Sequence, residues 1–125
     1  MMMSIPPKAL VPFAHVNDVA TSIAFYQKLG FTLGNTFTPP SAKEPVWAWL
    51  ASGGAQLMVA KADEPVVASQ QAVLFYIYVD DIPAKHAELT AAGITVGAIT
   101  HAFYAPSGEF RVLDPDGYVL MITHT

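Results

Sequence analysis

Residues 16–31 read VNDVATSIAFYQKLGF, and residues 79–94, which lie 63 positions further along, read VDDIPAKHAELTAAGI. Both stretches open with a valine and a short polar pair, continue with apolar residues, and reach a glycine near the end. Asp18 and Asp81 are suited to cap a helix start, and Gly30 and Gly93 stand where a left-handed residue ends a helix. The two stretches therefore predict two helices in equivalent places.

The same shift of 63 positions also aligns the later part of each half. Gly54 falls on Gly117, and Met58 falls on Met121. One constant register, with no gap between the two ends of each half, indicates a duplicated structural unit.

Strand candidates surround each helix, because short runs rich in β-branched and aromatic residues are bounded there by turn residues. The expected strands are residues 11–16, 31–37, 45–51 and 55–61 in the first copy, and 73–79, 94–99, 109–113 and 118–123 in the second. The polar, proline-containing segment 62–71 is predicted to be a linker. We therefore expect one α+β domain over residues 1–125, made of two βαβββ modules at about 8–61 and 72–125.

The composition excludes several classes of protein. Hydrophobic residues make up 53% and charged residues 13% of the chain, which is typical of a well-filled core and not of disorder. The net charge is −4 and Arg111 is the single arginine, so we expect neither nucleic acid nor a membrane as partner. Cysteine is absent, which excludes disulfides and thiolate chemistry. Residues 1–8 show no secretion signal, and we expect a cytoplasmic protein.

Two motifs resemble one known family. The first motif is similar to the opening signature of the glyoxalase/bleomycin-resistance/extradiol dioxygenase (vicinal oxygen chelate) superfamily, and it consists of Asp18-Val19, residues 22–26 and Leu29-Gly30-Phe31. The second motif, residues 114–118, resembles the closing hairpin of the same family. The resemblance covers nearly the whole chain. It implies tandem βαβββ modules that form an open, cupped mixed sheet with the helices outside, often completed as a homodimer.

The resemblance also implies where a metal would bind. In the enzymes of this family, His or Glu/Gln side chains on the first and fourth strands of each module hold a divalent ion. The matching positions here are Val11, Met58, Leu74 and Met121, which offer no oxygen or imidazole donor. We therefore expect no metal and no cofactor, in the manner of the family's metal-free bleomycin-resistance branch. The four histidines lie on separate elements without ligand spacing, at positions 15, 86, 101 and 124.

Strand alternation suggests which side chains line the cup. Phe13 and His15 fall on the face of the first-strand ligand position, as do Tyr76 and Tyr78 in the second module. His15 is either a hydrogen-bonded residue at a strand end or a polar group of the site. Met58 and Met121 either line the cup or belong to the core.

Three further assignments stay open in the sequence. Trp47 and Trp49 share one strand face, which either lines the cup or packs beneath a helix. A bulged turn at Gly117 places Glu109 and Arg111 on the cup face, whereas a two-residue turn places Phe110 and Val112 there. In the first case Glu109 and Arg111 either face a ligand or form a surface ion pair. Tyr104 is either the tip of a lid or an ordinary turn residue.

An apolar, aromatic cup without a metal is typical of binding more than of catalysis. We expect a protein that sequesters a bulky apolar or cationic aromatic small molecule, as in antibiotic resistance of the bleomycin type. One alternative is an enzyme with a non-standard site, a glyoxalase-like lyase or another enzyme, in which His15 or Glu109 acts as the general base. A second alternative is an interaction subunit whose cup is closed by its own side chains.

Overall fold

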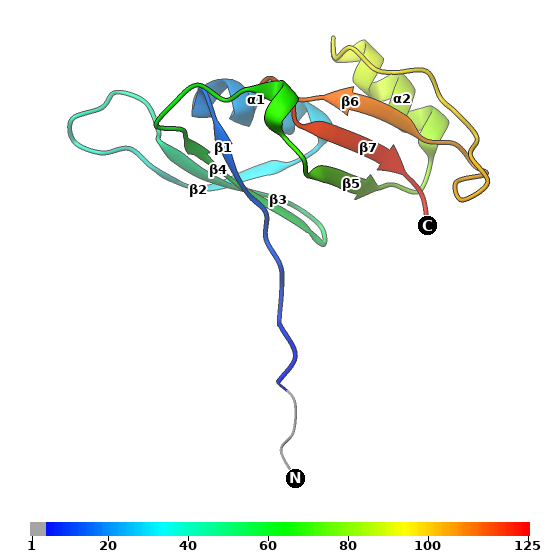
Figure 1. Ribbon diagram of the computed structural model, residues 1–125, viewed down its shortest axis with the longest axis horizontal. Coiled ribbons are helices and arrows are strands. Elements are labelled where there is room, and N and C mark those ends of the chain that lie inside the picture. Colours follow the sequence, from blue (N-terminus) through cyan, green and yellow to red (C-terminus); the bar gives the residue numbers. More distant parts are fainter. Residues whose placement is uncertain (1–4) are drawn as a thin grey trace.

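The computed structural model describes residues 5–125 of the chain. It contains two mixed sheets and two helices, with the sheets side by side along the long axis of the molecule (Figure 1). The first module consists of β1 (Phe13–Val16), α1 (Val19–Leu29), β2 (Thr32–Phe37), β3 (Trp47–Ser52) and β4 (Ala55–Lys61). The second consists of β5 (Leu74–Tyr78), α2 (Ile82–Ala91), β6 (Phe110–Leu113) and β7 (Val119–Thr123), after a short 3₁₀ helix η1 (Ala68–Gln70).

The two sheets share one topology. Their strand orders are β1-β4-β3-β2 and β5-β7-β6, and in each sheet the first strand is parallel to the last one of its module. Phe13 pairs with Met58 in the first sheet, and Tyr76 pairs with Met121 in the second. These two pairs are related by the shift of 63 positions, so the repeat read from the sequence is a repeat of structure.

Both helices begin at the predicted capping residues. Asp18 Oδ1 accepts a hydrogen bond from the Ala20 amide, and Asp81 Oδ1 accepts one from the Ala84 amide. These bonds satisfy backbone donors that the first turn of a helix leaves without partners. Gly30 then ends α1 at φ 110°, in the left-handed region.

The second module lacks one of its expected strands. Residues 94–99 form no ladder: one isolated bridge joins Val96 to Val112 of β6, and a second joins Thr100 to Glu109, just before β6. The two bridges differ in register by one residue, so the pairing cannot continue between them. At Gly97 a Cβ would lie 3.0 Å from the Arg111 carbonyl oxygen, so the chain approaches β6 closely where only glycine fits. The prediction of a regular strand at 94–99 is therefore wrong.

Side chains on one face of each sheet pack with the helices into a single apolar cluster. In the first sheet this face carries Ala14, Val16, Ala48, Leu50 and Val59, which are all buried. In the second it carries Phe110, Val112, Leu120 and Ile122, against Ile82 and Leu89 of α2. The opposite face of each sheet is free of helices, and we call it the open face.

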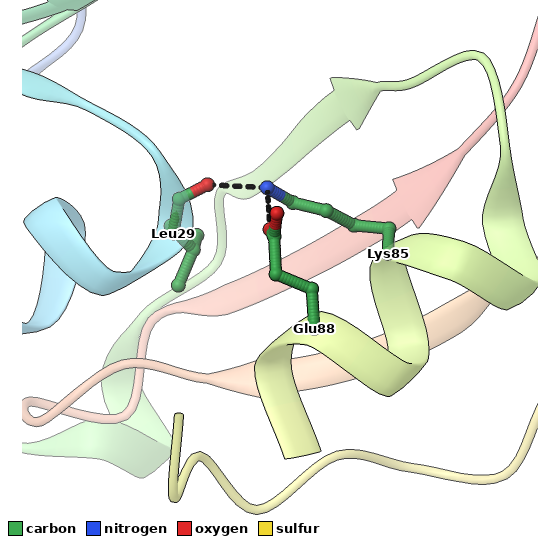
Figure 2. Close-up of polar contacts among 3 residues, drawn as sticks. All are labelled: Leu29, Lys85 and Glu88. Atoms are coloured by element: carbon green, nitrogen blue, oxygen red, sulfur yellow. Dashed lines mark hydrogen bonds and ion pairs between the residues drawn. The ribbon is translucent and has the colours of Figure 1, made fainter. Parts of the chain in front are cut away.

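Three contacts from side-chain donors hold the modules together, beside the backbone amide of Asn17, which donates to Asp116 Oδ1 (2.7 Å). The Tyr26 hydroxyl donates to Asp114 Oδ2 (2.7 Å), and the Tyr118 hydroxyl donates to the His15 carbonyl (2.7 Å). Figure 2 shows the third, in which Lys85 Nζ on α2 donates to the carbonyl of Leu29 at the end of α1 (2.6 Å) and to Glu88 (2.6 Å). A cation is favourable at this end of a helix because the last carbonyls carry partial negative charge.

Candidate ligand-binding face

Strand register assigns the open face of the first sheet without ambiguity. Trp49 pairs with Met58, which pairs with Phe13, and Trp47 pairs with Ala60, which pairs with His15. Residues directly opposite one another in a sheet project from the same side. The two tryptophans therefore line the open face together with Phe13, His15 and Met58, and do not pack beneath the helix.

The open face of the second sheet follows from the closing hairpin. The Gly117 amide donates to the Asp114 carbonyl (3.0 Å), the Asp114 amide donates to the Tyr118 carbonyl (3.0 Å), and Gly117 has φ 85°. The hairpin thus carries the extra residue of a bulged turn. As a result Arg111 pairs with Met121 on the open face, while Phe110 and Val112 are buried in the core.

The two modules differ at this point, which explains why their faces could not be inferred from the repeat. In the first hairpin Ser52 pairs directly with Ala55, so Gly53 and Gly54 form a two-residue turn. The second hairpin is one residue longer. A slip of one residue turns every side chain of a strand to the other face. Trp49 therefore lies on the open face, although the shift of 63 aligns it with the buried Val112.

The aromatic side chains on the open faces are accessible. Phe13, Tyr76 and Tyr78 are about half exposed, and Phe13 makes an edge contact with the ring of His15 (centroids 5.3 Å apart). Trp47, Trp49, Met58 and Met121 are partly buried. The open faces therefore present ring faces and thioethers to the surroundings.

The family's metal-ligand positions carry hydrocarbon and thioether groups in this structure as well. Met58 and Met121 lie on the two open faces, and Leu74 lies beside Met121 on the second; Val11 comes just before β1. Divalent ions in this family need oxygen or imidazole donors, so these residues do not fit such an ion. Over residues 5–125 no three His, Cys, Asp or Glu side chains are grouped as a metal site.

The histidines lie apart and have separate roles. His86 Nε2 contacts the Gly97 carbonyl (2.9 Å), His101 Nδ1 contacts the Pro106 carbonyl (3.0 Å), and His124 Nε2 accepts a hydrogen bond from the Ser107 amide (2.9 Å). Only His15 projects onto an open face.

Glu109 departs from the expected open position. It is only 3% exposed, and its Oε1 accepts a hydrogen bond from the Tyr104 hydroxyl (2.8 Å). That bond, and then the charge on Glu109, raise the pKa of the Tyr104 hydroxyl. Glu109 and Arg111 form no ion pair, since the only one among residues 5–125 joins Lys85 to Glu88. Tyr104 is thus bonded to Glu109 from the loop before β6.

Sequence reasoning missed a groove of about 810 Å³ between α1 and the edge of β6. Of the predicted ligand residues only Arg111 lines it, beside Phe25 and Lys28 of α1 and the segment 93–97. Phe25 is the available signal, because it falls outside the helix face that carries Val19, Tyr26 and Leu29. The groove has one aromatic side chain, whereas the open faces have several.

A repeated mixed sheet with helices on one side and an open apolar face on the other defines the class of protein. The chain belongs to the Glyoxalase/Bleomycin resistance protein/Dioxygenase superfamily, whose family model matches residues 11–122. A search of the curated proteins finds no match.

Solved structures have the same fold. The bleomycin resistance determinant encoded on the transposon Tn5 is 18% identical with a TM-score of 0.76, covering 95% of this chain and 98% of that one. A bleomycin-binding protein in complex with bleomycin is 18% identical with a TM-score of 0.75, covering 95% and 99%. TnmS3, an antibiotic-binding protein from Streptomyces sp. CB03234, is 22% identical with a TM-score of 0.72, covering 98% of each chain.

Proposed function

We propose that this protein binds and sequesters a small molecule without a metal, and that the ligand is a bulky apolar or cationic aromatic compound held on the open faces. The observation that carries the proposal is the set of side chains there. Hydrocarbon and thioether groups occupy the positions at which the metal enzymes of the family place oxygen and nitrogen donors, and aromatic rings lie on the same faces. Such a surface favours stacking and contact between a cation and ring electrons.

The relatives support this proposal. Two solved structures with this fold are described as bleomycin-binding proteins, and a third as an antibiotic-binding protein. Their sequence identity to this chain is low, so they support the class of function and not the identity of the ligand.

A thermal-shift screen tests the proposal. Purified protein is heated in buffer containing EDTA with bleomycin and a panel of planar aromatic amines. A ligand present at 100 times its Kd stabilises the native state by about 2.7 kcal/mol, which raises the melting temperature by several degrees. We expect Trp49→Ala to remove that shift and Leu10→Ala, on the exposed segment before β1, to retain it. If none of these compounds shifts the wild-type melting temperature, the proposal is wrong.

We further propose that the open faces are completed by a second copy of the chain. Their apolar side chains remain substantially exposed in one chain, among them Phe37, Leu74 and Leu113. Exposed apolar patches of this kind are typical of interaction surfaces. Sedimentation equilibrium with Tyr76→Lys tests this: we expect the wild type to be dimeric and the variant monomeric. A monomeric wild type at micromolar concentration contradicts it.

Across residues 5–125, neither helix combines the length and the apolar character that crossing a bilayer requires.

A further inference from the structure

One carboxylate oxygen of Glu109 is buried without a partner. Oε1 accepts the Tyr104 hydroxyl, but Oε2 has essentially no exposed surface and no hydrogen-bond partner within residues 5–125. Leaving a buried polar group unsatisfied costs about 1–3 kcal/mol, and more for a charged group. Most buried polar atoms in proteins have a partner, so an exception such as Oε2 calls for a reason.

Among residues 5–125 no cation is paired with this oxygen. Arg111 lies two residues further along, in β6, and makes no ion pair with Glu109. Lys85 is engaged by Glu88 and the Leu29 carbonyl. The net charge of −4 adds no compensating positive potential. Since no donor within residues 5–125 is bonded to Oε2, the oxygen is available to accept one from a bound molecule.

Aromatic rings lie next to the carboxylate. Tyr104 is 59% exposed although its hydroxyl contacts Glu109, and the neighbouring Phe103 is almost fully exposed. Tyr76, on the open face, is close enough to contribute to the raised pKa of the Tyr104 hydroxyl. The surroundings of Glu109 thus combine a carboxyl oxygen without a partner with aromatic rings, both of which attract a cation.

We propose that Glu109 Oε2 is the acceptor for a protonated nitrogen of the ligand, an ammonium or amidinium attached to an aromatic ring system that lies on the second open face. This inference rests on the proposed binding function and specifies its ligand class. Because Oε2 has essentially no exposed surface in the free protein, the proposal requires a local rearrangement when the ligand enters. The hydrogen bond formed then satisfies the oxygen that the free protein leaves without a partner.

Two probes with the same ring and different charge test the inference. 2-Naphthylmethylammonium and 2-naphthylmethanol differ only in the group that would reach Glu109. Their affinities are measured by ligand-observed NMR for the wild type, for Glu109→Gln and for Glu64→Gln. Glu64 is exposed in the segment between the modules, so its variant makes the same change in net charge away from the site.

We expect the wild type to bind the ammonium about tenfold more tightly than the alcohol, as a charge-assisted hydrogen bond allows. Glu109→Gln should remove most of that preference, chiefly by weakening the binding of the ammonium. Glu64→Gln should retain the preference. An ammonium preference that survives Glu109→Gln overturns the inference and leaves the binding function standing, whereas failure of both probes to bind the wild type overturns both.

A measurement on the wild type alone covers the case in which Glu109→Gln does not fold. With the glutamate carboxyl carbons labelled, addition of the ammonium should shift the Glu109 resonance and leave that of Glu64 in place. An unchanged Glu109 resonance at saturating ammonium contradicts the inference.

Discussion

The Tyr26 hydroxyl donates a 2.7 Å hydrogen bond to Asp114 Oδ2, joining residues 88 positions apart in the chain. Tyr26 lies on α1 of the first module, and Asp114 begins the closing hairpin of the second. Asp114 Oδ1 meanwhile accepts the amides of Asp116 and Tyr118. This buried contact therefore fixes the hairpin whose bulge turns Arg111 toward the open face.

Removing the tyrosine hydroxyl should destabilise the protein. Tyr26→Phe leaves a buried carboxylate oxygen without its donor, so we expect the free energy of unfolding to fall by about 1–3 kcal/mol in urea titrations. Tyr76→Phe removes a hydroxyl from a half-exposed side chain and should cost less than about 0.5 kcal/mol. Equal effects of the two variants would contradict the role given to the Tyr26–Asp114 contact.

The same carboxylate should make stability depend on pH. Burial raises the pKa of Asp114, and hydrogen bonds from Tyr26, Tyr118 and Asp116 lower it only in part. A carboxyl whose pKa is higher in the folded than in the unfolded state contributes stability below the unfolded value of about 3.9, and this contribution is lost as pH rises through the folded pKa. We expect the unfolding free energy of the wild type, relative to that of Asp114→Asn, to decrease from pH 4 upward and then level off. A difference that does not vary with pH, or that increases, is inconsistent with a raised pKa.

The contact in Figure 2 should contribute to the docking of the two helices. Lys85→Met keeps most of the apolar stem but loses the donor to the Leu29 carbonyl, and we expect a loss of about 1 kcal/mol in the free energy of unfolding. Lys43→Met, in an exposed loop, serves as the control and should be nearly neutral. If Lys85→Met is also neutral, the contact does not stabilise the protein.

Alanine at two turn glycines should separate backbone strain from steric clash. Gly53 and Gly117 both have positive φ, but an added Cβ meets nothing within 4 Å at Gly53, whereas at Gly117 it would lie 2.2 Å from the Cβ of Ala68. Gly53→Ala should cost about 1 kcal/mol from strain alone, and Gly117→Ala considerably more. Ala68→Gly in the Gly117→Ala background should recover part of the loss in melting temperature. No recovery would show that the clash with Ala68 is not the cause.

Much of the fold was predictable because it depends on local signals. Asp18 and Asp81 cap the helices as expected, and the repeat places Met58 and Met121 on equivalent strands. The regular strand expected at 94–99 does not form, because the two bridges near it differ in register by one residue. Alternation cannot reveal such a difference in register.

The sequence predicted which side chains share a strand face in the candidate site, but not which of the two faces is the open one. Whether Trp49 and Arg111 lie on an open face depends on the length of each hairpin turn, and the two turns differ by one residue. Sequence alternation gives two faces and cannot say which one meets the helices. The burial of Glu109 and its hydrogen bond to Tyr104 depend on a loop conformation that no periodicity signals.

Tryptophan fluorescence tests the central claim most directly, because both tryptophans of the chain lie on the open face of the first sheet. Protein in EDTA-containing buffer is titrated with a planar aromatic amine, and Trp emission is followed together with the heat of binding. We expect a saturable change in emission that follows the heat without any added metal. Binding that leaves the emission unchanged, or that requires a divalent ion, would contradict it.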